Sequence, residues 1–189
     1  MKKSNKYGND YALSFHKVGQ KDAELLSKFK CEYPAICHFI QEESIDDNNC
    51  VSYIFVDDTD NVIIGFCSIC CSGILVSDKD EKGEPFTTSI PSVKIEYFAV
   101  DEEYRGIKLS EDSDRYETLS KAFMIFIKNH IRIFALNTCG AAHICLYSVP
   151  MAINFYKRCG FEPFEEYMIR DGFPFLDGCT PMFCEIERE

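Results

Sequence analysis

The segment Ile144–Phe161, with the sequence ICLYSVPMAINFYKRCGF, contains residue types whose order can build a chemical site. An apolar strand, a proline turn and a short helix carrying Tyr156 are followed by a Gly-Phe return. Such a unit can aim one phenol into a cleft beside a strand edge. An unperturbed phenol has a pKa of about 10, so it holds its proton at neutral pH and can donate it. The alternative is a core tyrosine whose hydroxyl is satisfied by one hydrogen bond.

A second candidate site follows the predicted strand Ser92–Val100, where a polar loop leads into a buried helix. The unpaired N–H groups and the dipole at a helix start can hold a phosphate group. The loop contains Arg105-Gly106; glycine allows close approach of the backbone, and arginine adds charge for a pyrophosphate. The same dipeptide is also common in surface turns, which is the alternative here.

Glu96 is a third candidate, because it interrupts the otherwise apolar strand SVKIEYFAV. A carboxylate in that position is costly unless it is solvated or paired. It can act as a base, directly or through water. The alternatives are a carboxylate that faces solvent at a sheet edge, or one paired with Lys94 or Arg132. The neighbouring Tyr97 is an alternative group to line a cleft.

The elements that would position these residues alternate between strands and helices. Asp22 is expected to cap the first helix, Pro34 to open the second, and Gly140 and Gly160 to end the last two. The strands are predicted at 11–18, 51–56, 62–76, 92–100, 141–148, 165–169 and 181–186. The helices are predicted at 22–29, 34–43, 119–136 and 151–158. This order predicts an α/β (α+β) fold with one mixed, mostly antiparallel sheet of about six to seven strands, flanked by about four helices.

The chain of 189 residues has the length of a single domain covering 1–189. We expect residues 1–10 to be a flexible N-terminus, 77–84 to be a charged solvated loop, and 101–118 to be a long loop beside the cofactor or substrate. The sequence contains no apolar run long enough to span a membrane and no apolar stretch typical of a signal peptide, which predicts a cytoplasmic protein.

The composition includes eleven cysteines, which we expect to be reduced thiols. Cys67 and Cys70 form a CxxC within a predicted strand, where their side chains should point apart. We therefore expect no metal site. The formal net charge is −11. Nucleic-acid binders usually carry a basic face, so this charge argues against nucleic acid and favours a cationic substrate or simply solubility.

The sequence VDEEYRG resembles the start of the acetyl-CoA loop of the GCN5-related N-acetyltransferases (GNAT), commonly Val-x-x-x-Tyr-Arg-Gly-x-Gly-x-Gly/Ala before a long helix. Val100, Tyr104, Arg105 and Gly106 match this pattern. The resemblance implies the acyl-CoA N-acyltransferase fold over about residues 11–186, with acetyl-CoA as cosubstrate and no metal.

The phosphate loop departs from the family pattern after Gly106. Lys108 and Ser110 stand where the family has its later small residues, and the run EDSDRYETLS follows. Side chains at a phosphate cradle crowd the backbone and restrict positive φ. Either the loop uses Thr118, Leu119 and Ser120 at the helix start, or cofactor binding is weaker than usual.

The resemblance also implies roles for individual residues. Tyr156 corresponds to the family's general acid, which protonates the departing thiolate, and Glu96 is our candidate for the base. The backbone of Phe98–Val100, including Ala99, would bind the pantetheine arm where the sheet splays open. Asn154 is a further candidate for a cofactor contact. In the family the acetyl group passes directly from the thioester to the amine, without an acyl-enzyme.

Several segments resemble the toxin branch of the family, whose members acetylate aminoacyl-tRNA. They are 29–31, the hairpin at 51–69, IPSVKIEYFAVDEEYRG and GAAHICLYSVPMAINFYKRCGFEPF. Those toxins need a basic surface for RNA, and this chain is acidic. The sequence therefore favours an acetyltransferase acting on a primary amine of a small molecule or peptide. The alternatives are the toxin activity and a catalytically weak acyl-CoA-binding protein. A homodimer is possible in either case, since dimers are common in the family.

Overall fold

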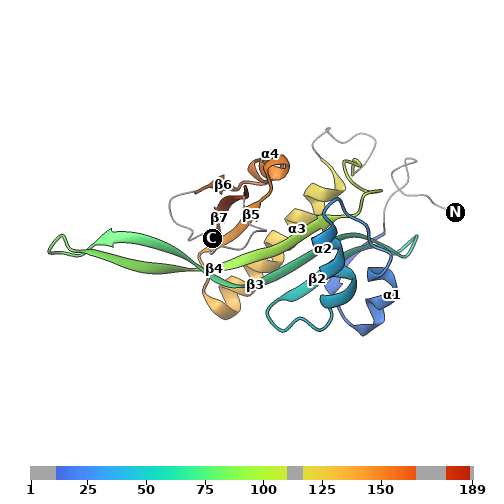
Figure 1. The fold of residues 1–189 in the computed structure, drawn as a ribbon, viewed down its shortest axis with the longest axis horizontal. Helices are drawn as coiled ribbons and strands as arrows, with labels where there is room; N and C mark the ends of the chain where they lie inside the picture. Colours follow the sequence, from blue (N-terminus) through green and yellow to red (C-terminus); the bar gives the residue numbers. More distant parts are fainter. Residues whose placement is uncertain (1–11, 110–116, 165–177, 188–189) are drawn as a thin grey trace. The chain divides into compact units, whose positions relative to one another are not determined.

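The computed structural model describes residues 12–109, 117–164 and 178–187. The predicted flexible N-terminus at 1–10 and the predicted strand at 165–169 lie outside these residues. The strands form a seven-stranded sheet in the order β1-β2-β3-β4-β5-β7-β6 (Figure 1). The strands are β1 (Leu13–Lys17), β2 (Val51–Asp57), β3 (Val62–Lys79), β4 (Pro85–Val100), β5 (His143–Ser148), β6 (Glu162–Pro163) and β7 (Thr180–Glu185). The α-helices are α1 (Ala23–Leu26), α2 (Pro34–His38), α3 (Leu119–Phe134) and α4 (Ile153–Arg158).

The sheet is mixed, as predicted. β1 with β2, β2 with β3, β5 with β7 and β6 with β7 pair antiparallel, whereas β4 and β5 run parallel. The chain divides into two compact units. The first contains the chain up to Ile69 together with Glu96–Ile127, and the second contains Cys70–Ile95 together with the chain from Lys128 onward.

The first unit has a hydrophobic core on each face of its strands. Alternate residues of a strand point to opposite faces, and in β2 Ile54 packs with the side chains of α1 and α2, whereas Phe55 stacks on Phe123 of α3. The buried residues on the α1 and α2 side form one cluster: Leu26, Phe29, Ile36, Phe39, Ile40, Ile54, Val56, Ile63, Phe66 and Ala99. The first half of α3 therefore covers one face, and α1 and α2 cover the other.

The close packing of α3 depends on Gly65 in β3. A Cβ atom at this position would lie 2.5 Å from two ring atoms of Phe123 and 3.3 Å from the carbonyl oxygen of Ala99. No side chain fits there without a shift of the helix or the strand. Gly65 thus brings the Phe123 ring against the sheet, where it also stacks on Phe98 with ring centroids 5.2 Å apart.

The two short N-terminal helices begin differently from each other. Pro34 is the first residue of α2, as predicted, and its missing N–H costs nothing there. Asp22 precedes α1, but the prediction that it caps the helix is wrong. Its carboxylate accepts the backbone N–H of Gly19 at 2.9 Å and lies 3.2 Å from Nε2 of His16. A 3-10 turn at Gln20–Asp22 starts the helical segment earlier than predicted, which gives the carboxylate this different role.

The second unit is built on β5, which has a parallel neighbour on one side and an antiparallel neighbour on the other. β5 pairs with β4 from Ser92↔His143 to Ile95↔Leu146 and with β7 along its whole length. Cys145 of β5 is completely buried in a cluster with Ile74 and Phe164. The parallel arrangement explains why β5 reads as an almost continuous apolar run in the sequence.

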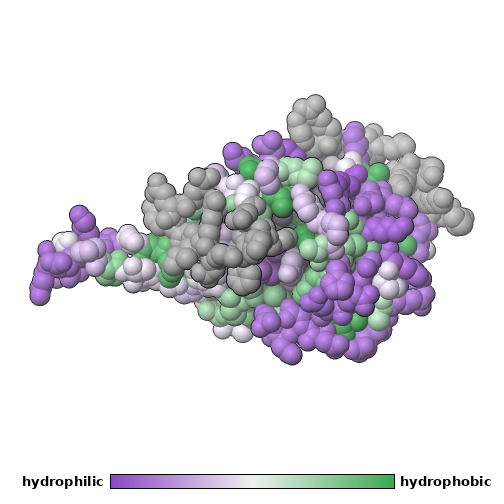
Figure 2. Space-filling view, in the orientation of Figure 1, coloured by the Kyte–Doolittle hydropathy of each residue, from purple (hydrophilic) through white to green (hydrophobic). Residues whose placement is uncertain are grey.

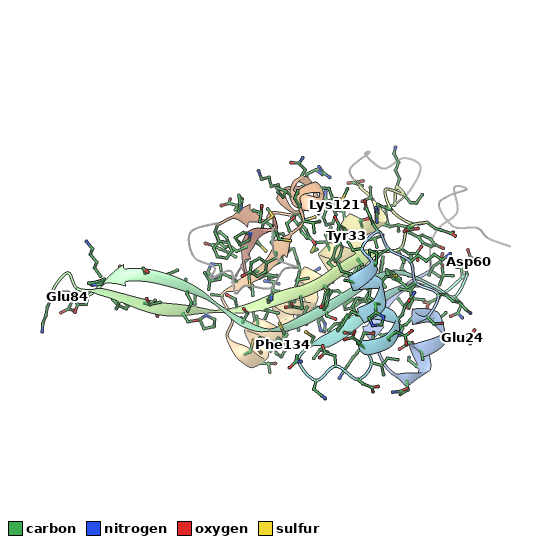
Figure 3. All side chains as sticks on the ribbon, viewed as in Figure 1. Glu24, Tyr33, Asp60, Glu84, Lys121 and Phe134 are labelled. Carbon is green, nitrogen blue, oxygen red and sulfur yellow. The ribbon has the colours of Figure 1, made fainter. Side chains whose placement is uncertain are left out.

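The β3–β4 hairpin is longer than predicted. The segment 77–84 was expected to be a loop, but β3 continues to Lys79 and only the turn remains, with the N–H of Asp80 donating to the carbonyl of Glu84 at 2.9 Å. Figure 3 labels Glu84 at this turn, and Figure 2 shows hydrophilic residues there. Charged side chains on a two-stranded ribbon can reach water on both faces, so their charge does not oppose strand structure.

All eleven cysteines are free thiols. Cys67 is fully buried in β3, and burial raises the pKa of its thiol, whereas Cys70 is partly exposed. Within 12–109, 117–164 and 178–187, no group of three or more His, Cys, Asp or Glu side chains is placed to hold a metal ion. No helix in these ranges has the length and apolar character needed to cross a membrane.

Candidate active site

The Arg105-Gly106 turn lies in the first unit, directly after β4. Gly106 adopts φ +72°, a left-handed conformation that favours glycine, although a Cβ atom would have open space around it. Tyr104 is buried, and its N–H donates to the carbonyl of Asp101 at 2.9 Å. The match to the Tyr-Arg-Gly pattern therefore has a local structural basis, because tyrosine anchors the turn and glycine makes it possible.

The guanidinium group of Arg105 is held by a residue that the sequence did not point to. Its Nη1 donates to Oε2 of Glu32 at 2.6 Å, and both side chains are about half exposed. Two hydrogen bonds donated by backbone N–H groups connect the same two segments. Lys30 N–H donates to Oδ2 of Asp101, and Glu102 N–H donates to the carbonyl of Lys30. The connection between α1 and α2 thus supports the turn.

The far end of the loop returns to its beginning. Lys108 forms an antiparallel bridge with Thr118, and the N–H of Leu119 donates to the carbonyl of Ile107 at 2.9 Å. Thr118 Oγ1 accepts the N–H of Lys121 at 3.3 Å. The amides of Leu119 and Lys121 in the first turn of α3 are therefore already used within the chain.

The remaining predicted residues of this loop are placed as follows. Lys108 is exposed, whereas Leu119 and Ser120 are buried. Ser110 lies outside the described residues. The residues predicted to act at the helix start are Thr118, Leu119 and Ser120, and of the two polar ones Ser120 is buried.

Strand β4 carries Glu96 and the predicted pantetheine-binding segment. The Phe98 ring stacks on Phe123 of α3, and Ala99 belongs to the core under α1 and α2. Since side chains alternate along a strand, Glu96 is on the same face as Phe98. Glu96 is partly buried. From the sequence, Lys94 and Arg132 were alternative ion-pair partners of Glu96. In the second unit Lys94 lies over the ring of Tyr147, and Arg132 donates to the carbonyl of Glu187.

The face of β4 opposite Glu96 carries an aromatic pair. Tyr97 stacks on Phe39 with ring centroids 4.2 Å apart. Burial raises the pKa of Tyr97, and the negative charges of Glu96, Glu43 and Asp47 raise it further. Phe39, Glu43 and Asp47 were not among the predicted site residues. Their acidity was visible in the sequence, but their proximity to Tyr97 depends on the packing of α2 and the following π-helical turn Phe39–Glu43.

The parallel pairing between β4 and β5 is short. It ends at Ile95↔Leu146, although β4 continues to Val100. The backbone of Phe98–Val100 therefore lies beyond the last residue pair of that register. This segment precedes the Arg105-Gly106 turn in the chain.

Tyr156 lies in the second unit, on α4, and its side chain is 7% exposed. Its ring meets Phe155 and Phe161 edge to face, at centroid distances of 5.3 and 5.8 Å. The Tyr156 carbonyl accepts the N–H groups of Cys159 and Phe161, and Gly160 has φ +84° between them. This arrangement is a glycine-dependent helix end of the Schellman type, which confirms the predicted stop at Gly160. Asn154, on the same helix, is exposed.

The predicted residues thus fall into two groups. The first unit brings together Glu96, Phe98, Ala99, Val100, Arg105, Gly106, Lys108, Leu119 and Ser120. The second unit contains Tyr156 and Asn154.

Comparison with known proteins gives matches at the level of structure. No family model and no curated protein matches the sequence. A variant of the AtaT toxin with one tyrosine replaced by phenylalanine is 16% identical, with a TM-score of 0.67, covering 97% of this chain and 96% of that chain. The same variant bound to acetyl-CoA and to the C-terminus of the antitoxin AtaR is 17% identical, with a TM-score of 0.62 and coverages of 92% and 93%.

A third solved structure is AtaT complexed with acetyl-methionyl-tRNAfMet. It is 18% identical, with a TM-score of 0.60, and the match covers 89% of this chain and 93% of that chain. At these identities the likeness concerns the fold. The chain has the mixed seven-stranded GNAT fold of these toxins, the fold that its VDEEYRG and closing strand–helix segments predicted.

Proposed function

We propose that this protein is an acetyl-CoA-dependent N-acetyltransferase that moves an acetyl group directly from the thioester to a primary amine. The observation that carries the proposal is the early end of the β4–β5 pairing at Ile95↔Leu146. It leaves the backbone of Phe98–Val100 beyond that register, just before the Arg105-Gly106 turn. Extended backbone groups followed by a turn that carries the Arg105 guanidinium suit a pantetheine arm and a pyrophosphate.

In the proposed reaction the amine nitrogen attacks the acetyl carbon, and the C–S bond breaks. Glu96 accepts the amine proton, directly or through water, and Tyr156 donates its phenolic proton to the departing sulfur. The products are an amide and the free thiol of coenzyme A. No residue of the protein becomes acetylated. Proton transfer of this kind contributes a factor of about 10² to 10⁴ to the rate.

We propose aminoacyl-tRNA as the first candidate acceptor. The support is the similarity in fold, over nearly the whole chain, to AtaT complexed with acetyl-methionyl-tRNAfMet. This choice reverses the preference drawn from the net charge of −11, which is a property of the whole chain and not of one surface. An antitoxin segment is the corresponding candidate partner, since a matching toxin binds the C-terminus of one.

A small cationic amine or peptide is the second candidate acceptor. The carboxylates of Glu43 and Asp47 favour it, because their negative charge acts on Tyr97, the sequence neighbour of the proposed base Glu96, and would attract a cation. The third possibility is an acyl-CoA-binding protein with little activity. The amides of Leu119 and Lys121 at the start of α3 are occupied, which favours weak binding of the cofactor pyrophosphate there.

One assay separates these possibilities. Release of the coenzyme A thiol from acetyl-CoA would be measured with a pool of aminoacylated tRNA, with the same tRNA after deacylation, and with polyamines, amino acids and peptides. Thiol release with aminoacylated tRNA, abolished by deacylation, would support the first acceptor. Release with the small amines alone would support the second. Calorimetric binding of acetyl-CoA without turnover would leave the binding protein, and absence of binding would refute the proposed function.

A further inference from the structure

Lys128 is a partly buried cation that the proposed reaction does not use. It lies on α3 at the start of the second unit's C-terminal segment. Its Nζ donates to the carbonyl of Cys159 at 2.9 Å and lies 5.4 Å from the centroid of the Phe161 ring. Burial raises the pKa of the Cys184 thiol of β7, and the charge of Lys128 acts to lower it, against this larger effect. The ammonium group therefore lies beside a carbonyl, a buried ring and a buried thiol.

The Lys128 contacts converge on the end of α4. Cys159 is the residue after the last helical residue of α4, where a carbonyl lacks an intrahelical partner and a cation interacts favourably with the helix dipole. A Cβ atom at the adjacent Gly160 would lie 3.4 Å from Nζ, so the turn passes closely over the ammonium group. A Lys side chain from one helix thus caps the C-terminus of another.

The same contacts reach Tyr156 through one further residue. The Phe161 ring, which is 1% exposed, has the ammonium group above its face and meets the Tyr156 ring edge to face. The Phe161 N–H donates to the Tyr156 carbonyl at 3.0 Å. Both the backbone and the ring of Tyr156 are therefore fixed against a turn that Lys128 holds.

From these contacts we infer that Lys128 is a positioning residue, which fixes the C-terminal turn of α4 and with it the direction of the Tyr156 phenol. This inference rests on the proposed function in that Tyr156 is taken as the general acid. Small displacements of a catalytic group can reduce turnover by about a hundredfold. Lys128 should therefore affect kcat although it does not take part in proton transfer.

The test uses the full-length protein with acetyl-CoA and a pool of aminoacylated tRNA. Lys128→Met keeps most of the side-chain volume and removes both the charge and the donor. We expect kcat to fall about ten- to a hundredfold, with KM for acetyl-CoA changed less than twofold, and Lys128→Arg to restore most of the loss. Lys157→Met, which removes an exposed lysine of α4, is the control and should leave kcat unchanged.

A double-mutant comparison distinguishes positioning from general destabilisation. If Lys128 acts through the phenol, then Lys128→Met should cause no further loss of kcat in a Tyr156→Phe background. The same fold loss in both backgrounds would overturn the inference. All variants would be assayed well below their melting temperatures, and Lys128→Gln would replace Lys128→Met if the latter does not fold.

Hydrogen exchange provides a readout that needs no turnover. The amides of Cys159 and Phe161 should exchange at least tenfold faster in Lys128→Met, while those of α2 should be unchanged. Unchanged exchange over residues 153–161 would refute the role of Lys128 even if the acceptor proves to be something else. Loss of activity on Tyr156→Phe with no effect of Lys128→Met on either readout would refute this inference alone and leave the proposed function standing.

Discussion

Arg105 and Glu32, far apart in the sequence, form an ion pair in which Nη1 lies 2.6 Å from Oε2. Glu32 belongs to the connection between α1 and α2, and Arg105 to the turn after β4. The pair orients the guanidinium group but also competes with any phosphate for its charge. This relationship leads to opposite expectations for the two side chains.

Replacing Arg105 with alanine should weaken acetyl-CoA binding about tenfold or more, because a charge-assisted hydrogen bond contributes about 1.5–3 kcal/mol. Glu32→Gln should strengthen acetyl-CoA binding by up to about fivefold. In this variant Arg105 no longer has to give up its exposed ion pair with Glu32, worth about 0.2–1 kcal/mol, to bind a phosphate. Isothermal titration with acetyl-CoA measures both effects. Glu24→Gln is the matched control, because Glu24 of α1, which is labelled in Figure 3, is also exposed and pairs with Lys28 at 2.6 Å. Weaker binding in Glu32→Gln would mean that orientation matters more than competition.

Tyr156→Phe removes a hydroxyl from a ring that is packed on Phe155 and Phe161, so the fold should be preserved. We expect kcat to fall about ten- to a thousandfold, with KM for acetyl-CoA nearly unchanged, because a general acid acts in the transition state. Steady-state thiol release measures both constants. Tyr53→Phe is the control, since Tyr53 stacks on Phe15 in the first unit. Wild-type turnover in Tyr156→Phe would remove the phenol from the mechanism.

Gly65→Ala should destabilise the first unit by about 1–3 kcal/mol, the usual range for overpacking. The new methyl group would lie 2.5 Å from the Phe123 ring, a distance that real Cβ atoms do not show, and would also make a tight contact of 3.3 Å with the Ala99 carbonyl oxygen. Urea unfolding gives the free energy directly. Gly19→Ala serves as the control, because no atom lies within 4 Å of the added methyl group there. Equal stabilities would show that α3 can move away from the sheet without cost.

Alkaline pH should destabilise the fold through one partly buried and one buried thiol. Burial raises the pKa of Cys31 and of Cys184 from 9.0 to about 11. Between pH 9 and 11 the unfolded chain loses these protons while the folded chain keeps them, so the unfolding free energy falls as the pH rises. Below about pH 9 these two thiols do not change the unfolding free energy with pH.

The urea midpoint measured from pH 7.5 to 10.5 checks this expectation. Cys184→Ala should flatten the decline, by at most about 1.4 kcal/mol per pH unit. Cys71→Ala, which removes an exposed thiol, should not. If the urea midpoint of the unsubstituted protein stays constant up to pH 10.5, the raised pKa values of Cys31 and Cys184 are contradicted.

The elements with strong local signals were predicted correctly from the sequence. Pro34 opens α2 and Gly160 ends α4, both as predicted. In each case the residue type has a conformational restriction or freedom that acts within a few positions. The β5 strand was equally clear, because a strand whose two faces are both largely buried needs an apolar run.

Predictions that depended on solvent exposure were less accurate. The charged residues near the β3–β4 turn were taken for a loop, although charge is compatible with a two-stranded ribbon. Asp22 was taken for a helix cap, although its carboxylate instead accepts the Gly19 N–H. Both errors have the same cause. A polar residue indicates that water or a polar partner is near its side chain, but it does not indicate which backbone conformation it adopts.

The sequence by itself determined the order of strands and helices, the Tyr-Arg-Gly turn and the short helix with its phenol, because these follow from local conformational preferences and apolar periodicity. Only the tertiary structure decided that Glu32 binds Arg105 and that Lys128 caps α4. Such contacts join residues that are distant in the chain, and any of several acidic or basic side chains could have made them. Their choice depends on how helices pack on the sheet, which is a property of the whole core and not of a motif.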